Sequence, residues 1–205
     1  MESVADKRVQ QIMKRIFDVM VAFGSLLVLS PLLAVIAIAI RISSGSPIFY
    51  RWQVVGQGGQ LFASWKFRTM IADADRVKEE LNHHNEMSGP VFKMKEDPRV
   101  TPIGRVLRKF SLDELPQLWS VLKGDMSMVG PRPPLQSEFE RFTDWQKKKL
   151  AIKPGMTSLW HVKGKPRDFD EWVTLDLEYI DHWSFWLDLK ILLQTAIVVL
   201  TGKNY

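Results

Sequence analysis

Residues 19–40 read VMVAFGSLLVLSPLLAVIAIAI, 22 consecutive positions without a charged side chain. A helix of about 20 apolar residues covers the roughly 30 Å hydrocarbon core of a bilayer, because each residue adds about 1.5 Å. By length alone the stretch is a candidate transmembrane helix. This stretch decides the fold because it separates the chain into an apolar segment and a remainder with the polar, basic and Trp-rich composition of a globular domain.

The centre of this stretch, Ser30-Pro31, argues against a simple crossing. Proline removes a backbone donor, clashes with the preceding turn and disfavours the α conformation of the residue before it. Each half of about 11 residues gives roughly 16 Å of helix, which is too short to cross alone. The sequence therefore predicts an interruption of the helix at Ser30 and Pro31.

Basic residues flank the stretch on both sides, and no Asp or Glu occurs from residue 41 to residue 72. Because Lys and Arg favour the cytoplasmic side, two basic flanks favour both ends on that side. We therefore predict a re-entrant helix–break–helix hairpin that dips into one leaflet. A proline-kinked spanning helix and a buried core helix are the alternatives. The flanking cations are Lys7, Arg8, Lys14, Arg15, Arg41, Arg51, Lys66 and Arg68.

The composition limits what the whole chain can be. Of its 205 residues 46% are hydrophobic, including 11 Phe and 8 Trp, which suffices for a core and excludes a disordered or collagen-like chain. The absence of Cys excludes disulfides, thiolate metal sites and a Cys nucleophile. The net charge of +5 suggests an anionic partner, whether nucleic acid, anionic lipid or a phosphorylated small molecule.

Periodicity and turn signals predict a mainly α chain with a small β-hairpin, an α+β fold. Residues 1–42 are expected to form an amphipathic lead-in and the membrane hairpin, and residues 43–205 a cytoplasmic globular domain. The last helix is either interfacial or buried, because its uncharged residues 191–200 are too few to span a bilayer. Strands are expected at 47–55 and 61–67, helices at 1–18, 70–81, 103–110, 111–123, 137–152, 170–181 and 185–200, and loops at 82–99 and 130–134.

Asp113 and Glu114 form an adjacent carboxylate pair in the stretch SLDELPQ. Either Ser111 and Glu114 form a capping box, or Pro116 opens the helix and the carboxylates precede it. An ionised carboxylate can attack phosphorus when cations offset the charge on the target. The alternative is a helix cap with solvated charges. Because cations precede the pair, both carboxylates are expected to stay ionised at neutral pH. These cations are Arg105, Arg108 and Lys109.

Two further sets of cations are candidates for phosphate contacts. Arg132 lies in a Gly-Pro-Arg-Pro-Pro stretch, where restricted φ angles can hold a guanidinium for a bidentate contact. The alternative is a surface Arg in a structural loop. Lys66 and Arg68 are two residues apart on a predicted strand and therefore share a face, which is either phosphate-facing or solvated.

Motifs of several other function classes are missing from the sequence. The stretch GQGG at residues 56–59 lacks the Lys and Ser/Thr of a P-loop and is interpreted as a turn, and neither G-x-G-x-x-G nor G-x-S-x-G occurs. The four His residues lack the spacing of a zinc site. Basic and aromatic residues alternate without a nucleic-acid-binding motif, so no nucleic-acid partner is expected.

A set of short motifs occurs in order along the chain. These stretches are KRIFD at 14–18, the block broken at Ser30-Pro31, WKFRTM at 65–70, DPRVT at 97–101, GRVLR at 104–108, SLDELPQL at 111–118, GDMSMVGPRP at 124–133, KPGMT at 153–157 and DLK at 188–190. Together they resemble the bacterial sugar transferases, which are monotopic polyprenol-phosphate phosphoglycosyl transferases. The ordered set covers nearly the whole chain and is highly specific. The Trp-rich C-terminal part is more similar to the catalytic domains of longer hexose-1-phosphate transferases, which usually carry an additional N-terminal membrane bundle.

The resemblance implies an enzyme that transfers a sugar-1-phosphate from a UDP-sugar to undecaprenyl phosphate and releases UMP. A UDP-hexose, with glucose or galactose, is the expected donor. In the family the Asp of the Asp-Glu pair forms a covalent phosphosugar intermediate, a role that falls on Asp113. Glu114 would position it and, together with Asp113, the Mg²⁺ ion that the family needs. The residues expected to hold the donor phosphates are Lys66, Arg108, Arg132 and Lys165.

The same resemblance implies the cytoplasmic face of the bacterial inner membrane as the location and its lipids as partners. The expected process is the first membrane step of exopolysaccharide, capsule or O-antigen synthesis. The oligomeric state stays open, a homo-oligomer included. The alternative function, of a different class, is a catalytically inactive membrane-surface adaptor with the same fold.

One loop departs from the family pattern. Where the family commonly has Pro-Gly-Ile-Thr-Gly-x-x-Gln-Val-x-Gly-Arg, residues 154–165 are PGMTSLWHVKGK. Lys165 keeps the charge of the family's Arg but loses its planar fork of donors. Ser158 and His161 alter the same loop, so the donor contacts expected there differ from the family's.

Overall fold

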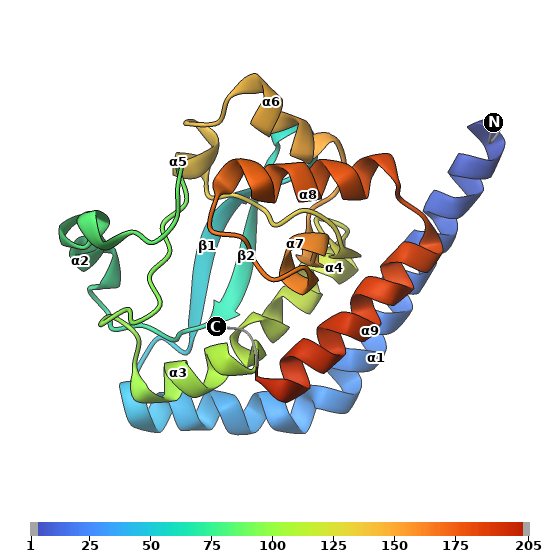
Figure 1. The fold of residues 1–205 in the computed structure, drawn as a ribbon. Helices are drawn as coiled ribbons and strands as arrows, with labels where there is room; N and C mark the ends of the chain where they lie inside the picture. The colour runs from blue at the N-terminus through green and yellow to red at the C-terminus, as the bar shows by residue number, and fades with distance from the viewer. Residues whose placement is uncertain (1–3, 203–205) are drawn as a thin grey trace.

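The computed structural model describes residues 4–202 of the chain, and their side chains from residue 9 onward. Its first element is a single long helix, α1 (Val4–Ser44), which contains Pro31. Figure 1 shows that this helix bends between two limbs, one running beside the last helix of the chain and one passing below the rest of the molecule.

The predicted interruption at Ser30 and Pro31 is wrong, because α1 continues through both residues. Pro31 has no N–H to donate to the carbonyl four residues earlier, which is that of Leu27. The Ser30 hydroxyl donates to this same carbonyl at 2.8 Å and so replaces the missing donor. The helix therefore bends instead of breaking.

Both ends of α1 are attached to the same globular body. Near the start of the helix, Arg15 donates to the carbonyls of Val121 and Leu122, at 2.6 and 2.9 Å. At its other end, Arg68 donates to the carbonyls of Ser44, Gly45 and Ser46. A helix that crossed a bilayer would put its ends on opposite sides, so these contacts favour the re-entrant over the spanning arrangement.

The alternative of a buried core helix is wrong. Only 11% of the most apolar window of α1 is buried, although this helix is long and apolar enough to cross a membrane. Its exposed side chains include Phe23, Leu27, Val28 and Val35, each more than half exposed. A soluble core helix buries such side chains, so the exposed faces of α1 are suited to lipid.

The predicted β-hairpin is confirmed. Strands β1 (Phe49–Val55) and β2 (Leu61–Phe67) pair antiparallel, with Phe49 opposite Phe67 and Val55 opposite Leu61. The GQGG stretch forms the connecting turn, where Gly58 and Gly59 adopt positive φ angles that favour glycine.

A second, parallel pair of strands was not predicted. Strands β3 (Ser127–Val129) and β4 (Gly155–Thr157) contain three residues each. Their backbones approach so closely that a Cβ added to Gly155 would lie 2.0 Å from the nitrogen of Gly130. Glycine at both positions therefore permits this pairing, and such short strands give no periodic signal.

The helical predictions at 103–110, 170–181 and 185–200 are confirmed. The helix expected at 1–18 is confirmed from residue 4 as the start of α1, and residues 1–3 lie outside the described part of the chain. Three other predictions change. The helix expected at 70–81 begins only at residue 74, and residues 111–123 divide into a 3-10 helix and an α-helix. Residues 137–152 divide because Thr143 caps a new helix, accepting from Gln146 N–H and donating its own N–H to the Gln146 side chain. The helices are α2 (Ala74–Glu80), η2 (Asn82–His84), α3 (Pro102–Lys109), η3 (Leu112–Gln117), α4 (Leu118–Lys123), α5 (Gln136–Phe139), α6 (Asp144–Lys147), η4 (Lys148–Ala151), α7 (Leu159–Val162), α8 (Phe169–Asp181) and α9 (Phe185–Thr201).

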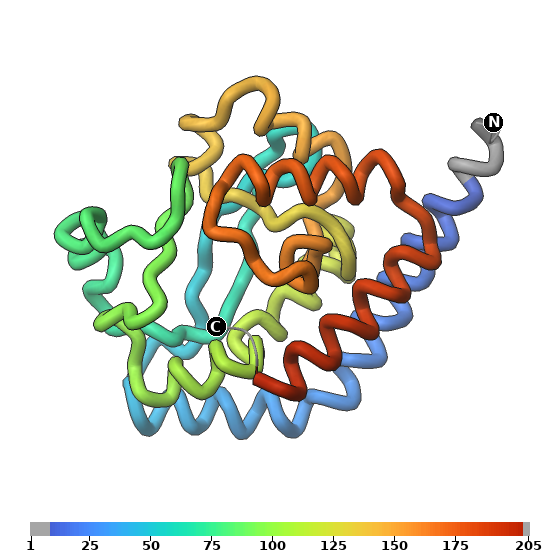
Figure 2. The backbone as a smooth tube through the Cα atoms, in the orientation of Figure 1, coloured from blue at the N-terminus to red at the C-terminus, as the bar shows by residue number. Residues whose placement is uncertain are grey.

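The last helix was predicted to be either interfacial or buried, and α9 has one buried side and one exposed side. It runs beside the first limb of α1 (Figures 1 and 2), where Phe17 and Phe185 pack edge to face at 5.2 Å. Its Ile191 is fully buried in the core, whereas Trp186 is 78% exposed. One side of the helix thus belongs to the core, and the other joins the exposed apolar surface of α1.

The two limbs of α1 pack against different parts of the body. In the first limb, Ala22 joins the main core with residues of α4, β3, α8 and α9. In the second limb, Ile36 and Ile40 pack with Phe67 of β2 and Leu107 of α3. A third apolar cluster, around Trp172 of α8, lies away from α1. Helix α1, called the foot below, is therefore packed against the elements that also build the cavity described in the next section.

We expect both ends of α1 to be accessible from the same side of a membrane. The chain has no Cys, so Val9→Cys and Ser43→Cys each introduce one thiol, and Val28→Cys serves as a matched control within the apolar segment. In sealed vesicles of one orientation, a membrane-impermeant maleimide should label both end positions together and leave position 28 protected, although Val28 is 75% exposed in the structure. Labelling of the two ends from opposite sides would show that the chain spans the bilayer.

Candidate active site

A cavity of about 530 Å³ opens between the β-hairpin, η3 and the loops that follow β3 and α7. All the catalytic and phosphate-binding residues expected from the family resemblance line this one cavity, although they come from five separate segments of the chain. These residues are Lys66, Arg108, Asp113, Glu114, Arg132 and Lys165.

Asp113 is held at the cavity in a desolvated position. It lies in the first turn of the 3-10 helix η3, and its side chain is 8% exposed. Burial and the charge of the neighbouring Glu114 together raise the pKa of Asp113 to about 6, against the opposing effect of Lys66 and Arg108. The carboxyl is thus mostly ionised at neutral pH, as predicted, but it titrates close to that range.

Of the two alternatives for this stretch, the capping box at Ser111 is wrong. Ser111 adopts a left-handed conformation with φ of 51°, and its side chain does not cap η3. Pro116 lies inside η3, so the carboxylates precede the α-helix α4. Ser111 and Lys165 are the non-glycine residues with positive φ within residues 4–202, and both line the cavity. Backbone strain of this kind concentrates at functional sites.

Glu114 is paired with Lys66. The Lys66 ammonium donates to Glu114 Oε1 at 2.7 Å and lies 4.2 Å from the ring centroid of Trp52. Burial alone would raise the pKa of Glu114, but the charge and hydrogen bond of Lys66 hold it below the usual range. The two adjacent carboxyls are therefore driven apart in pKa, which is the pattern expected when neighbouring carboxyls have different roles.

Arg108 is positioned by the contact between α3 and the end of β2. Its Nε donates to Thr69 Oγ1 at 2.9 Å. A Cβ on Gly104 would lie 2.2 Å from the Thr69 carbonyl, so only glycine lets α3 approach this closely. Thr101 caps the start of α3 by accepting from Gly104 N–H. The helix and its Arg108 are thus fixed beside Asp113.

Arg132 is held among aromatic rings, a contact that the sequence did not predict. Its guanidinium lies 6.0 Å from the ring centroid of Trp52 and 5.6 Å from that of Trp172. Nη1 also lies 3.4 Å from Glu138 Oε2. The side chain is about one third exposed, toward the cavity that it lines. The guanidinium is therefore oriented without being fully neutralised.

Lys93 is a further cation of the cavity that was not predicted. The Asn85 side chain folds the loop back by accepting from Lys93 N–H at 2.8 Å and donating to the Val91 carbonyl at 3.0 Å. Lys93 Nζ lies 5.0 Å from the ring centroid of Trp160. Burial lowers the pKa of Lys93, and Arg132 lowers it further. No sequence motif surrounds Lys93, so only its place in the folded loop identifies it.

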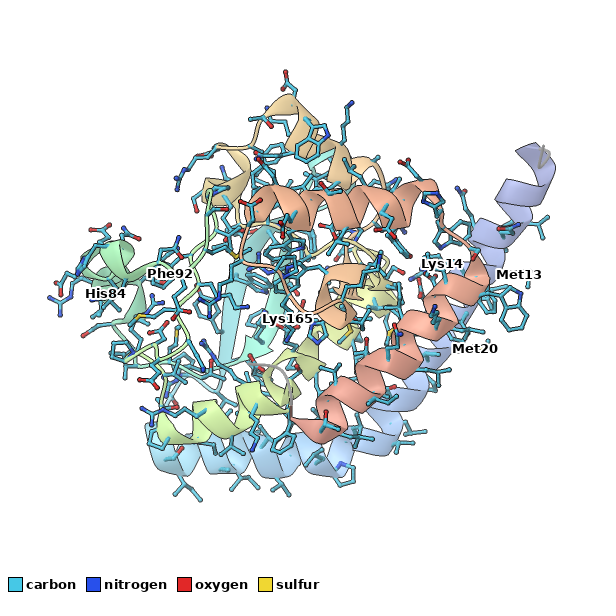
Figure 3. The ribbon with its side chains drawn as sticks, viewed as in Figure 1. Met13, Lys14, Met20, His84, Phe92 and Lys165 are labelled. Atoms are coloured by element: carbon cyan, nitrogen blue, oxygen red, sulfur yellow. The ribbon has the colours of Figure 1, made fainter. Side chains whose placement is uncertain are left out.

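Lys165 lies toward the centre of the body in Figure 3. Burial lowers its pKa to about 8, the neighbouring Lys93 contributes in the same direction, and Glu114 opposes both. In the same wall, Ser158 caps α7 by accepting from His161 N–H. The departures from the family pattern at residues 158, 161 and 165 thus gather in one wall of the cavity.

The alternative of a solvated face is wrong for Arg68, although it lines the cavity together with Lys66. Its guanidinium is buried and bonded to the carbonyls that end α1, as described above. Arg99 is also committed to structure, because it forms a bidentate pair with Asp97 at 2.9 and 2.6 Å. The cations open to a ligand are therefore a subset of the basic residues around the cavity.

The carboxylates of the cavity suit a partial set of Mg²⁺ ligands. Within residues 4–202 no group of three or more His, Cys, Asp or Glu side chains could enclose a metal ion. Mg²⁺ commonly binds through one or two protein carboxylates and completes its shell with substrate phosphates and water. Asp113 and Glu114 can supply that share, while one oxygen of Glu114 is already bound to Lys66.

Replacement of Asp113 by Asn should stabilise the chain at neutral and alkaline pH. The folded-state pKa of about 6 exceeds the unfolded value of 3.8, so ionisation above pH 6 disfavours the folded state, and this penalty disappears as the pH falls toward 4. The penalty is on the order of 3 kcal/mol. Thermal unfolding of Asp113→Asn should therefore occur several degrees above wild type at pH 8 and converge with it only at about pH 3.5, below the unfolded-state pKa.

The control for this measurement is Asp144→Asn on α6, where the carboxylate is fully exposed. It should leave the unfolding temperature unchanged at both pH values. A lower unfolding temperature of Asp113→Asn at pH 8 would show that the Asp113 charge stabilises the fold.

Known proteins similar to this chain share most of its length. The profile of the family described as bacterial sugar transferase matches residues 9–202. The galactosyl transferase CpsE of Streptococcus agalactiae is 46% identical over 195 residues, covering 94% of this chain and 43% of that protein. The undecaprenyl-phosphate galactose phosphotransferase of Salmonella typhimurium is 43% identical over 199 residues, covering 95% and 42%. The exopolysaccharide production protein ExoY of Sinorhizobium fredii is 39% identical over 208 residues, covering 99% and 92%.

This chain spans less than half the length of the first two relatives and nearly the whole length of ExoY. The family match covers α1, the cavity and α9 together, so it includes every element that builds the site. The chain belongs to the bacterial sugar transferase family.

Proposed function

We propose that this chain transfers a sugar-1-phosphate from a UDP-hexose to undecaprenyl phosphate and releases UMP. The observation that carries the proposal is the desolvated carboxyl of Asp113 in a cavity lined by cations. The names of two relatives, a galactosyl transferase and an undecaprenyl-phosphate galactose phosphotransferase, support the same reaction class. They favour galactose or a related hexose as the sugar.

In the first step, a carboxylate oxygen of Asp113 attacks the phosphorus that carries the sugar. A bond forms between this oxygen and phosphorus, and the bond from phosphorus to the bridging oxygen of the diphosphate breaks. UMP leaves with that oxygen and its electron pair, so no proton need be transferred. Burial leaves the carboxylate poorly solvated, which favours its attack once cations offset the phosphate charge.

In the second step, an oxygen of undecaprenyl phosphate attacks the same phosphorus. The new diphosphate bond forms as the bond to Asp113 breaks, and the carboxylate is regenerated. The two substrates thus use the cavity in turn. Such ping-pong chemistry suits a soluble donor and a lipid acceptor that both present a phosphate to one cluster of cations.

The cations of the cavity have distinct environments in this scheme. Arg132 and Arg108 are oriented by neighbours and can make planar contacts to phosphate oxygens. Lys66 is shared with Glu114, and Lys165 lines the same cavity. When bound, Mg²⁺ would be held by Asp113 and Glu114 and would neutralise charge on the diphosphate.

The foot formed by α1 would place this cavity at the cytoplasmic surface of a bacterial inner membrane. The attachment of both ends of α1 to the body supports a re-entrant arrangement. The exposed apolar side of α9 lies beside α1 and would enter the same lipid layer. The acceptor lipid then reaches the cavity from the bilayer on which the body rests.

A catalytically inactive membrane-surface adaptor is the second candidate. An adaptor needs the foot and the basic surface but has no use for a desolvated carboxyl. The raised pKa of Asp113 indicates that its ionised form is disfavoured in the fold. Strain and charge of this kind at one site favour the enzyme.

Asp113→Asn should abolish UMP release even when no acceptor is present. With a panel of UDP-hexoses and Mg²⁺, the wild-type chain should release up to about one UMP per molecule without acceptor, because the covalent intermediate accumulates. The variant should lose more than about 1,000-fold in rate. Asp144→Asn, an identical change on the exposed surface of α6, should behave like wild type. UMP release by Asp113→Asn would exclude Asp113 as the nucleophile, and liposome binding without any turnover would favour the adaptor.

The rate of UMP release without acceptor should fall below pH 6. Asp113 attacks only as the carboxylate, and its pKa of about 6 means that protonation removes the nucleophile as the pH decreases through that value. Single-turnover rates measured from pH 5 to pH 8 should show a tenfold loss for each pH unit well below the pKa. A rate independent of pH between 5 and 7 would contradict the assigned environment of Asp113.

A further inference from the structure

Two side chains of α1 bind consecutive residues of strand β3. Asp18 Oδ1 accepts from the N–H of Met128 at 3.1 Å, and Lys14 Nζ donates to the carbonyl of Val129 at 3.2 Å. Lys14 and Asp18 are four residues apart and therefore share one face of the helix. Val129 is the last residue of β3 and directly precedes the loop that carries Arg132.

A buried network holds the Lys14 ammonium in place. Lys14 is paired with Asp188 of α9, which is 2% exposed. The Tyr179 hydroxyl donates to Asp188 Oδ1 at 2.6 Å and lies 3.2 Å from the same Val129 carbonyl. Trp183 Nε1 lies 3.3 Å from Asp188 Oδ2. Figure 3 shows Lys14 on α1 at the side of α9. The Val129 carbonyl thus accepts from side chains of two elements, the charged Lys14 of α1 and the neutral Tyr179 of α8.

The segment from Val129 to Arg132 has little freedom to absorb a displacement. Gly130 N–H donates to the Thr157 carbonyl at 2.9 Å, and the Pro131 carbonyl accepts from Gly155 N–H at 2.9 Å. Proline fixes φ both before and after Arg132. A shift of the Val129 carbonyl would therefore be passed on to the guanidinium and not lost in a flexible loop.

We propose that Lys14 is a positioning residue for Arg132, through its bond to the Val129 carbonyl. The first limb of α1 then does more than anchor the body, because its docking on β3 sets where the phosphate-binding guanidinium lies. This inference rests on the proposed function, in which Arg132 binds a phosphate of the donor. It predicts weaker donor binding when Lys14 is removed, even in a chain that is otherwise stable.

The test separates positioning from stability by removing two charges together. Lys14→Met alone leaves Asp188 buried without its cation, which destabilises a fold whatever else Lys14 does. The double variant Lys14→Met with Asp188→Asn removes both charges and keeps the shapes. Its unfolding temperature should lie close to wild type, while KM for the UDP-hexose should rise about tenfold, the effect of losing one charge-assisted hydrogen bond, with a smaller change in kcat.

A double-mutant cycle shows whether this effect passes through Arg132. In an Arg132→Ala background the same double variant should change KM by less than about twofold, because the group that it positions is gone. Arg15→Met is the matched control: it lies next to Lys14 but binds the end of α4, so its effect should add to that of Arg132→Ala. Titration calorimetry with UDP gives the same cycle without turnover.

Several outcomes would overturn the inference. The first is a wild-type affinity for UDP in the double variant. The second is a full tenfold effect of the double variant in the Arg132→Ala background. The third is a wild-type KM in the double variant, which would show that the effect of Lys14→Met on KM came from lost stability alone. Absence of UMP release by the wild-type chain would refute the proposed function instead, and the UDP affinities would still decide whether Lys14 positions Arg132.

Discussion

Two arginine side chains determine where α1 can lie, and the rest of the structure depends on that placement. Arg15 binds carbonyls at the end of α4, and Arg68 binds carbonyls at the end of α1 itself. Cations at the carboxyl end of a helix satisfy acceptors that lack intrahelical donors and oppose the helix dipole. Hydrogen bonds to charged groups contribute about 1.5–3 kcal/mol each. Because these contacts lie at opposite ends of an apolar segment, the segment has to leave the body and return to it. The Ser30 hydroxyl supplies the donor that lets the helix bend on this path.

Neighbouring side chains also determine the charge states of the two carboxyls at the site. Asp113 and Glu114 are adjacent in sequence, yet Lys66 stabilises the charge of Glu114 while burial disfavours that of Asp113. Only one carboxyl is left poorly solvated beside the cations, so one of the pair differs sharply in chemistry from the other. An uncompensated charge of this kind costs stability, and proteins retain such a cost mainly where activity requires it.

The features that could be predicted from the sequence are those with a local sequence signal. The hairpin follows from alternation around a glycine turn, α8 and α9 follow from periodicity, and the six site residues follow from an ordered set of motifs. The pairing of β3 with β4 could not be predicted, because it depends on the close approach of Gly130 and Gly155 from distant segments. Lys93 was missed because the Asn85 side chain, and not a motif, folds its loop over the cavity.

The capping box at Ser111 failed because spacing does not report a left-handed backbone. The break at Pro31 failed because a neighbouring hydroxyl replaced the lost donor.

The size of the cavity bears on the order of the chemistry. About 530 Å³ lies within the range of sites that hold one small ligand, roughly 300–1,000 Å³. A nucleotide sugar and a lipid phosphate bound together would each need cations, whereas Arg108, Arg132 and Lys66 line one shared cavity. In the proposed mechanism, a covalent intermediate on Asp113 would remove this conflict, because it would hold the transferred phosphorus while one phosphate leaves and another enters. The second limb of α1 packs against Phe67 and Leu107, in the elements that carry Lys66 and Arg108. If this limb lies in lipid, as proposed, the acceptor phosphate would arrive beside it and meet the same cations that the departing UMP releases.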